Sequence, residues 1–371
     1  MRIAIDGSAI PKQMAGAGVY TVQLVRALAQ IATEHEFVVF ARDGLFDDLQ
    51  SKMEIVPTGG KHPALRLAWE QAALPLLLRR HQIDLIHSPH HHAPILVGPG
   101  IRRVVTFNDV TFLLLPERYP RIRRYYMAAV TRAAARVVDA VITPSEAVTN
   151  DVVNELSLRP EKITTIPDAA GPQYAPSADA DVARVRSEYH LSGPYILSVG
   201  SQEPGKNRTR LIQAFQRIHG RQAGVQLVVI GQPAWNHAHD QQLVRELKLQ
   251  QSVRFLGYVP DGDLPALYTG AMFSAFPSLY EGFGLPVLES MASGTPVLTS
   301  DVGATAEVAG NAAVLVDPYD VDAIADAIAR LLDEEELRVQ LRTLGLERAS
   351  QFSWARTAQQ TLAVYERLLA S

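Results

Sequence analysis

The sequence predicts two α/β domains, each built around a parallel β-sheet and joined by a proline-rich connection. Three observations predict this fold class. The 371 residues are more than one hydrophobic core usually organises. Short apolar runs alternate with amphipathic segments, which is the pattern of strand–helix–strand units with parallel strands. The alternation is interrupted over residues 167–181, where Pro167, Gly171, Pro172 and Pro176 gather.

The first half begins with a buried strand at residues 3–6 and passes through Gly16-Ala17-Gly18 into an amphipathic helix. Pro75 is expected to kink a later helix, because proline lacks the amide donor. Ser145 is a favourable N-cap for the last helix of this half. Further strands are expected at residues 37–40, 85–87, 104–107, 140–143 and 163–166, and helices at 19–31, 65–80, 122–138 and 145–156.

The second half repeats the same alternation. Strands are expected at residues 195–199, 225–230, 253–256, 273–276, 297–299 and 313–316, and helices at 208–220, 240–249, 264–268, 321–332 and 354–369. Two such Rossmann-like halves leave a cleft between them. Ligands of open α/β sheets bind at the carboxyl ends of the strands.

The composition is that of a globular enzyme, with 47% hydrophobic and 20% charged residues. The net charge of −4 indicates no broad nucleic-acid footprint. The lack of cysteine excludes disulfides, thiolate metal sites and cysteine nucleophiles. The chain contains no run of about 18 apolar residues, so no membrane span is expected, and its start is expected to be a strand rather than a signal peptide.

The stretch from Ala275 to Ser300 holds two glutamates, Glu281 and Glu289, separated by seven residues. Gly284 allows a sharp turn and Pro286 has its φ preset for a first helical turn, so Glu281 is expected in a loop and Glu289 about one turn into a helix. The start of that helix favours a phosphate, and the carboxylates can accept hydrogen bonds from sugar or ribose hydroxyls. A surface loop with a charge-balancing glutamate fits these residues equally well.

Two glycine-containing loops each follow the first strand of a half. Gly16 and Gly18 let the backbone approach a phosphate or sugar, but the third glycine of a dinucleotide fingerprint is missing, so an ordinary turn is an equal alternative. Residues 200–207 do not form a Walker A loop, since no Ser or Thr follows Lys206. Lys206 is either a point charge for a leaving diphosphate or a solvated lysine.

Asn108 and Asp109 follow the strand expected at residues 104–107, and polar residues at strand ends face the ligand in this architecture. Asn108 is a candidate to bind a substrate hydroxyl. Asp109 is a candidate base or orienting group, although capping a helix is the commoner role of such an aspartate.

Four histidines lie within six residues from His87 to His92, which raises the question of a metal site. The Ser-Pro break, the lack of cysteine, and the position of Asp84 before the strand favour a polar lining or an acceptor contact instead. Asp261-Gly262-Asp263 likewise suits a turn or a helix cap better than a metal pair. No metal site is predicted.

The basic stretch from Arg118 to Arg136 interleaves arginines with tyrosines. It is a candidate to contact an anionic membrane surface or a phosphorylated acceptor. Charge runs are more often solvated helix faces, and we prefer that interpretation.

The segment SLYEGFGLPVLESMASGTPVLTS resembles the signature of the retaining nucleotide-sugar glycosyltransferases of family 4, which have the GT-B fold. The resemblance continues through the GxG loop, VVTFNDVTFLLLPE, SQEPGKN, Glu307-Val308-Ala309-Gly310, Val316-Asp317-Pro318 and the closing Phe352-Ser353-Trp354. It spans nearly the whole chain and is most similar to bacterial mannosyltransferase-like members. It implies an acceptor-side domain over residues 1–168, a nucleotide-sugar domain over 169–350, and a helix over 351–371 that crosses back to the first domain.

The resemblance also implies roles for individual residues. Glu281 would contact hydroxyls of the donor sugar, and Glu289 would hold the ribose. Lys206 would stabilise the leaving group. The remaining donor contacts would come from Gly16 and Gly18, from Ser201, and from the loop of Gly282, Phe283, Gly284 and Leu285.

Two departures from the family pattern stand out. Asn108 replaces a histidine near the anomeric carbon, and asparagine cannot become a cation, although it can donate a hydrogen bond. Ser201 stands where members often have arginine, so the diphosphate is expected to depend on Lys206, or on Arg208 or Arg210.

The resemblance implies a cytoplasmic hexosyltransferase, at most peripheral at the inner membrane face, that moves a mannose-type sugar from a nucleoside diphosphate to a saccharide or lipid-linked acceptor. It implies retention of configuration, no cofactor and no obligatory metal. Two alternatives stay open. A nucleotide-sugar epimerase would convert the donor without an acceptor, and a non-catalytic partner in a glycosylation complex, favoured by Asn108, would bind nucleotide without turnover.

Overall fold

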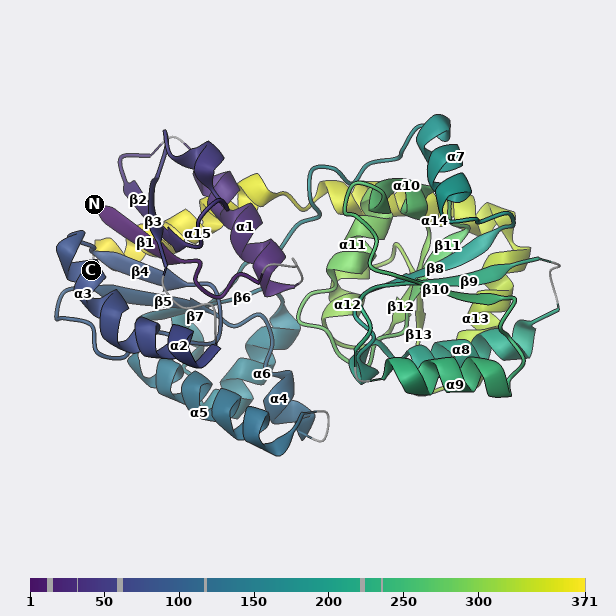
Figure 1. Ribbon diagram of the computed structural model, residues 1–371, viewed down its shortest axis with the longest axis horizontal. Helices are drawn as coiled ribbons and strands as arrows, with labels where there is room; N and C mark the ends of the chain where they lie inside the picture. The colour runs from purple at the N-terminus through teal and green to yellow at the C-terminus, as the bar shows by residue number, and fades with distance from the viewer. Residues whose placement is uncertain are drawn as a thin grey trace. The chain divides into compact units, whose positions relative to one another are not determined.

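The computed structural model of the protein describes residues 1–11, 16–31, 33–58, 63–116, 119–220, 224–234 and 236–370 (Figure 1). The chain divides into two compact units, each with its own parallel sheet. Unit 1 comprises Met1–Asp168 and Ser353–Ser371, and unit 2 comprises Ala169–Phe352. Every strand pairing in the described residues is parallel, as the alternation of strands and helices predicts.

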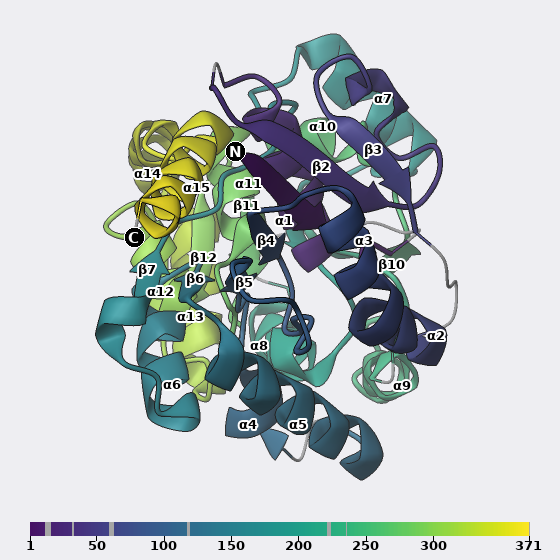
Figure 2. The same cartoon turned by 90° about the vertical axis from the view of Figure 1, so that its left-hand side faces the viewer.

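Unit 1 contains a seven-stranded sheet in the order β3-β2-β1-β4-β5-β6-β7. In Figure 2 this unit faces the viewer. The strands are β1 (Arg2–Asp6), β2 (Glu36–Ala41), β3 (Glu54–Pro57), β4 (Leu85–Ser88), β5 (Arg102–Thr106), β6 (Ala140–Thr143) and β7 (Ile163–Thr165). The helices that follow them are α1 (Ala17–Leu28), α2 (Pro63–Ala68), α3 (Leu74–Arg80), α4 (Thr111–Leu114), α5 (Arg121–Val137) and α6 (Glu146–Leu156). Ser145 caps α6 as expected, because its hydroxyl accepts the N–H of Val148.

The helix expected over residues 65–80 is divided by a π-helical segment, η2 (Trp69–Ala73). Pro75 explains the widening. It has no N–H to donate to the carbonyl of Gln71, and its ring would clash with that carbonyl in a regular α-helix. The N–H of Leu74 instead donates to the carbonyl of Trp69, five residues back.

The last helix, α15 (Trp354–Leu369), belongs to unit 1, where it packs on α1. The Thr357 hydroxyl donates to the carbonyl of Pro167. The buried hydroxyl of Tyr365 lies 2.6 Å from Nδ1 of His87, whose Nε2 lies 2.8 Å from the hydroxyl of Thr106. Polar contacts in the core therefore hold the end of the chain to β4 and β5.

Unit 2 contains a six-stranded sheet in the order β10-β9-β8-β11-β12-β13. The strands are β8 (Tyr195–Val199), β9 (Gln226–Ile230), β10 (Val253–Gly257), β11 (Phe273–Phe276), β12 (Val297–Ser300) and β13 (Val314–Val316). One face packs on α8 (Arg208–Ile218), α9 (His237–Glu246) and α13 (Val321–Asp333). The other packs on α7 (Asp179–Glu188), α10 (Leu264–Thr269), α11 (Leu285–Ala292), α12 (Gly303–Ala309) and α14 (Glu335–Ser350).

Five elements escape the sequence analysis, namely β3, α4, α7, α12 and α14. Strand β3 is a short, half-buried edge strand that ends in Pro57, which is where a strand tolerates proline. Helix α14 buries only Leu341 and Gly345, so its apolar periodicity is weak. Helix α7 begins inside the stretch expected to be a linker. None of the helices within the described ranges combines the length and apolarity that a bilayer crossing demands.

Candidate functional site

The loop before α11 has the geometry that its sequence predicts. Gly284 is the N-cap with φ of 108°, a left-handed conformation that favours glycine, and a side chain there would also press on Thr305. Pro286 occupies the first turn of α11. Glu281 therefore lies in the loop and Glu289 lies one turn into the helix. The N–H groups of Val287 and Leu288 donate to the carbonyl of Gly284 and Pro286 has no N–H, so Leu285 supplies the remaining donor of the first turn.

Glu281 and Lys206 form a two-point ion pair. The Lys206 ammonium lies 2.7 Å from one carboxylate oxygen of Glu281 and 2.8 Å from the other. The Lys206 side chain is 22% exposed and the Glu281 side chain is 16% exposed. The two loops are also joined by their backbones, since the N–H of Leu279 donates to the carbonyl of Gly205 over 2.8 Å. The structure thus brings together two predicted site residues that are 75 positions apart.

The loop that carries Lys206 is held by its neighbours. Arg208 is buried and donates to the carbonyl of Ser201 over 2.6 Å and to the carbonyl of Gly200. Burial lowers the pKa of the Arg208 guanidinium to about 10. Asn207 adopts a left-handed conformation, and its amide donates to the carbonyls of Pro277 and Pro318 at 2.8 and 2.6 Å. These contacts fix the loop beside Glu281.

Glu289 lies in a cluster of tyrosines. The Tyr268 hydroxyl donates to its Oε2 over 3.2 Å, and the Tyr174 ring lies 6.0 Å from the Tyr268 ring. Burial raises the pKa of Glu289 to about 7, and the tyrosine hydroxyls only partly offset that rise. A glutamate of this kind can donate or accept a hydrogen bond near neutral pH.

The other predicted residues of unit 2 lie in the same loops and at the first position of α11. Ser201 presents its carbonyl to Arg208. Phe283 is buried and packs edge-on against Phe352 at 6.0 Å between ring centres, which anchors the turn between Gly282 and Leu285. The arrangement offers one cation, two carboxylates and a helix N-terminus, which together suit an anion that carries hydroxyl groups.

The predicted residues of unit 1 lie at the start of α1 and just after β5. Gly16 is the N-cap of α1 with φ of 46°, and Gly18 is buried in its first turn. The Asn108 amide donates to the carbonyl of Pro89 over 3.3 Å. Asp109 accepts from both the N–H and the hydroxyl of Thr111, at 3.0 and 2.8 Å. Asp109 therefore fastens the start of α4, in line with a capping role.

No side chain of the Asp261-Gly262-Asp263 segment forms a capping hydrogen bond to α10. Asp263 stands at the N-cap position of α10, but its carboxylate accepts from Arg184 at 2.6 Å and from the Tyr189 hydroxyl at 2.7 Å. It therefore ties α7 to α10. The sequence analysis missed this tie because it overlooked α7.

Three residues that shape the site escaped the sequence analysis: Asn207, Tyr268 and Tyr174. Asn207 follows Lys206 directly, and an asparagine before a helix is a signal for a left-handed residue. No local signal links the two tyrosines to Glu289, because they come from other parts of the chain.

Comparison with known proteins identifies two family models in the chain. Residues 181–348 match the model described as "Glycosyl transferases group 1", and residues 14–170 match the model described as "Glycosyltransferase Family 4". Together they cover most of both units.

Among characterised relatives, the O-antigen chain mannosyltransferase B of Escherichia coli is 30% identical, over 99% of this chain and 100% of the relative. The MMP alpha-(1->4)-mannosyltransferase of Mycolicibacterium hassiacum is 33% identical, over 68% of this chain and 60% of the relative. A serotype-specific mannosyltransferase of Escherichia coli is 31% identical, and the match covers 34% of its length.

Solved structures show the same fold at low identity. Sucrose-phosphate synthase from Thermosynechococcus elongatus has a TM-score of 0.80 at 22% identity, with 100% of this chain and 99% of that chain covered. An Anabaena protein in complex with UDP-glucose has a TM-score of 0.79 at 20% identity, with 99% and 100% covered.

Proposed function

The chain belongs to the group 1, family 4 glycosyltransferases, and on that premise we propose that it moves a mannose-type hexose from a nucleoside diphosphate sugar to a saccharide or lipid-linked acceptor. Its two Rossmann-like units have the predicted GT-B fold. Three of the relatives described above are mannosyltransferases, and one builds an O-antigen chain, which supports mannose as the sugar and polysaccharide or glycoconjugate synthesis as the context.

The observation that best supports a donor-binding site is the ion pair between Lys206 and Glu281, in the loops before the N-terminus of α11. A diphosphate can take the place of Glu281 as the partner of Lys206, and it meets the positive end of the helix. Sugar hydroxyls can take the place of Lys206 as donors to Glu281. Glu289 would accept from the ribose hydroxyls. All four groups come from unit 2.

We propose transfer with retention of configuration. The bond from the anomeric carbon to the phosphate oxygen breaks, and the acceptor oxygen bonds to the same face of that carbon. The acceptor proton passes to the departing phosphate oxygen, so no protein base is consumed. In this scheme Lys206 and the helix N-terminus stabilise the developing charge, and no metal is required.

Asn108 and Asp109 are proposed to serve the acceptor side of the reaction. The amide of Asn108 can donate to a hydroxyl near the anomeric carbon in place of the imidazole that family members usually have. Asp109 would act by positioning this segment through Thr111. Gly16 and Gly18 would allow close approach of the α1 backbone to a phosphate or to the acceptor.

The test is a thermal-shift screen of nucleoside diphosphates and their sugars, followed by a product assay on each hit. A ligand at 100 times its Kd raises stability by about 2.7 kcal/mol, which such a screen detects. We expect a shift with one sugar nucleotide and an acceptor-dependent release of nucleoside diphosphate. Binding without turnover would favour the non-catalytic partner, and conversion of the donor without acceptor would favour the epimerase. No shift with any nucleotide would refute the donor site.

We further propose that α5 makes peripheral contact with an anionic membrane at the cytoplasmic face. Ile122 and Tyr125 are 87% and 65% exposed, beside Arg121, Arg123 and Arg124. Exposed apolar and basic side chains on one helix suit an interfacial contact. Arg118 of the predicted basic stretch lies outside the described residues. Co-sedimentation with vesicles should require anionic lipid and should weaken in the variant Ile122→Ser, whereas unchanged binding would contradict the contact.

A further inference from the structure

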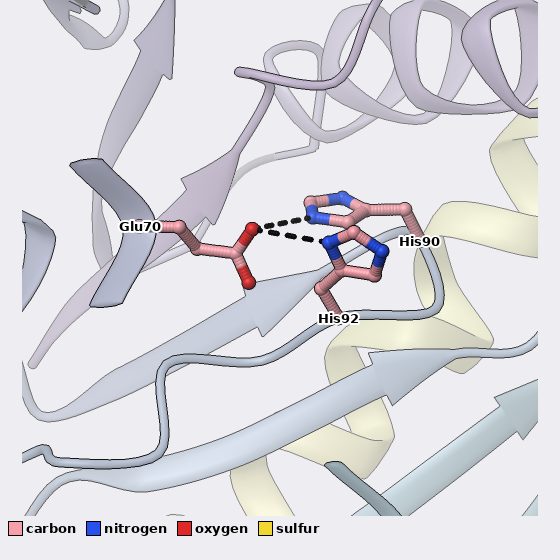
Figure 3. A group of neighbouring side chains, drawn as sticks. All are labelled: Glu70, His90 and His92. Carbon is pink, nitrogen blue, oxygen red and sulfur yellow. Dashed lines mark ion pairs between the residues drawn. The ribbon is translucent and has the colours of Figure 1, made fainter. Parts of the chain in front are cut away.

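Unit 1 contains a buried cluster of one glutamate and two histidines that the proposed transfer reaction does not use. Figure 3 shows Glu70, His90 and His92 with their polar atoms turned toward one another. Oε2 of Glu70 lies 3.4 Å from Nδ1 of His92 and 3.8 Å from Nε2 of His90. We propose that these three side chains bind a divalent transition-metal ion of the zinc class.

The cluster joins a π-helical segment to the loop after β4. Glu70 lies in η2, the π-helical widening before Pro75, and its side chain is fully buried. His90 and His92 lie in the loop after β4, and both are 8% exposed. π-helical turns occur frequently at functional sites. The widening turns a carboxylate inward at the level of the histidine loop (Figure 3).

The polar atoms of the cluster lack the hydrogen bonds that buried groups normally have. Both ring nitrogens of His90 and Nδ1 of His92 are buried without a hydrogen-bond partner. Oδ2 of Asp6 is likewise unpartnered and lies 3.5 Å from Nε2 of His90. Buried, unpaired nitrogen and oxygen atoms cost stability, so their convergence on one point indicates a missing partner.

The charge of the cluster calls for a cation. Asp6 and Glu70 are both fully buried. Arg66 approaches Glu70 at 3.5 Å and Gln71 donates to its other oxygen at 3.4 Å, both long contacts. A divalent ion would balance two carboxylates at once.

The ligand set and its spacing suit zinc. Zinc binds histidine nitrogen and carboxylate oxygen at about 2.0–2.2 Å in tetrahedral sites, which places neighbouring ligand atoms about 3.3 Å apart. The observed 3.4 and 3.8 Å are close to that spacing. Oδ2 of Asp6 lies 3.5 Å from Nε2 of His90 but outside the three-residue group, so its side chain would have to move to become the fourth ligand. The expectation of no metal site rested on the Ser-Pro break, the lack of cysteine and the position of Asp84, and Glu70, twenty residues before His90, was not among the residues considered.

The site would be structural, since a shared ion would fasten η2 to the loop after β4. The ion would add to two hydrogen bonds that already join these segments, from the Gln71 amide to the Ala93 carbonyl and from the Ile95 N–H to the Gln71 side chain, both at 2.9 Å. This inference does not rest on the proposed activity, because all of its residues and its readout concern unit 1 alone.

The test uses the full chain, stripped with chelator and titrated with zinc alone. Metal content after gel filtration should be one ion per chain, and cobalt should give the visible absorption of a four-coordinate centre. The variant His92→Gln should weaken zinc binding by at least about 100-fold. Losing a residue that only hydrogen-bonds to a metal ligand costs up to about 100-fold in affinity, and losing a ligand itself costs more. His239→Gln, on the exposed face of α9, is the matched control and should bind as the wild type does.

Two outcomes would overturn the proposal. The first is a wild-type chain that retains no zinc or cobalt at micromolar concentration. The second is equal binding by wild type and His92→Gln, which would show binding to surface histidines only. If His92→Gln does not fold, Glu70→Gln replaces it, and the wild-type titration alone still decides the question.

Discussion

Replacing Lys206 with methionine tests the proposed stabilisation of the leaving diphosphate. Methionine keeps an unbranched side chain of similar length and removes the charge. A group that stabilises developing negative charge in a transition state contributes about 3 kcal/mol. At about 1.4 kcal/mol per factor of ten, turnover at saturating donor and acceptor should fall by at least about 100-fold.

The fold should survive this change. The ion pair with Glu281 is short, and its side chains are 22% and 16% exposed. Both side chains are mostly buried, so the Glu281 carboxylate loses its partner in a partly desolvated site, and we expect the free energy of unfolding to fall by about 1–3 kcal/mol. The loop is also held by Asn207 and Arg208, which the substitution leaves in place. The variant should therefore remain folded while its activity falls.

The assay is the rate of nucleoside diphosphate release with acceptor present, compared with the urea midpoint of the same preparation. Lys52→Met is the matched control, because Lys52 is exposed on unit 1. Turnover of the Lys206 variant within a few-fold of wild type would refute the role of Lys206. An equal loss in the Lys52 variant would point to a general effect of charge.

Three other changes give separate tests. Tyr365→Phe removes the hydroxyl beside Nδ1 of His87 in the core, so the free energy of unfolding of unit 1, measured by calorimetry, should fall by about 1–3 kcal/mol. The control Tyr125→Phe lies on the exposed face of α5 and should leave it unchanged. Equal melting temperatures of the two variants would show that the Tyr365–His87 contact does not hold α15 in place. Burial raises the pKa of Glu289 from 4.5 to about 7, so between these pH values the folded state binds a proton that the unfolded state has lost. The stability that this group contributes is therefore fully present below pH 4.5 and is lost as the pH rises through about 7. The stability of wild type minus that of Glu289→Gln should therefore fall from pH 5 to pH 8, and a flat difference would show that the pKa is ordinary. Arg208→Lys keeps the charge but loses the guanidinium that donates to the carbonyls of Gly200 and Ser201, so the urea midpoint and the affinity for the donor should both fall. Unchanged values would show that the loop keeps its conformation without Arg208.

The elements with strong periodicity could be predicted from the sequence. The strands of both sheets, apart from the edge strand β3, and the turn between Glu281 and Glu289 follow from β-branched runs, glycine and proline. Their conformations are set by local sterics, which short stretches of sequence encode. Helix α14 was missed because it buries too few side chains to show a period.

Contacts between distant segments could not be predicted in this way. The pairing of Lys206 with Glu281 and of Glu70 with the histidine loop depends on which strands neighbour each other in the sheet. The π-helical turn shows the same limit. Pro75 signals that the helix is disturbed, but only packing determines that the disturbance turns Glu70 inward.

Ser201 stands where the resemblance implies an arginine, so in the proposed donor complex the diphosphate would depend on the nearby cations Lys206, Arg208 and Arg210. Arg208 donates to the carbonyls of Gly200 and Ser201, and burial holds it there. Arg210 donates to Asn207 and its guanidinium lies over the ring of Tyr319, 5.2 Å from its centre.

Of these three cations, Lys206 is the one whose partner is a carboxylate that a diphosphate can replace. In the proposed complex, phosphate oxygens accept from Lys206 while sugar hydroxyls donate to Glu281. Each charged group then exchanges one partner for another, and neither is left buried and unpaired during binding. The ion pair thus keeps both side chains in position before the donor arrives, which is the preorganisation that charge stabilisation in a transition state requires.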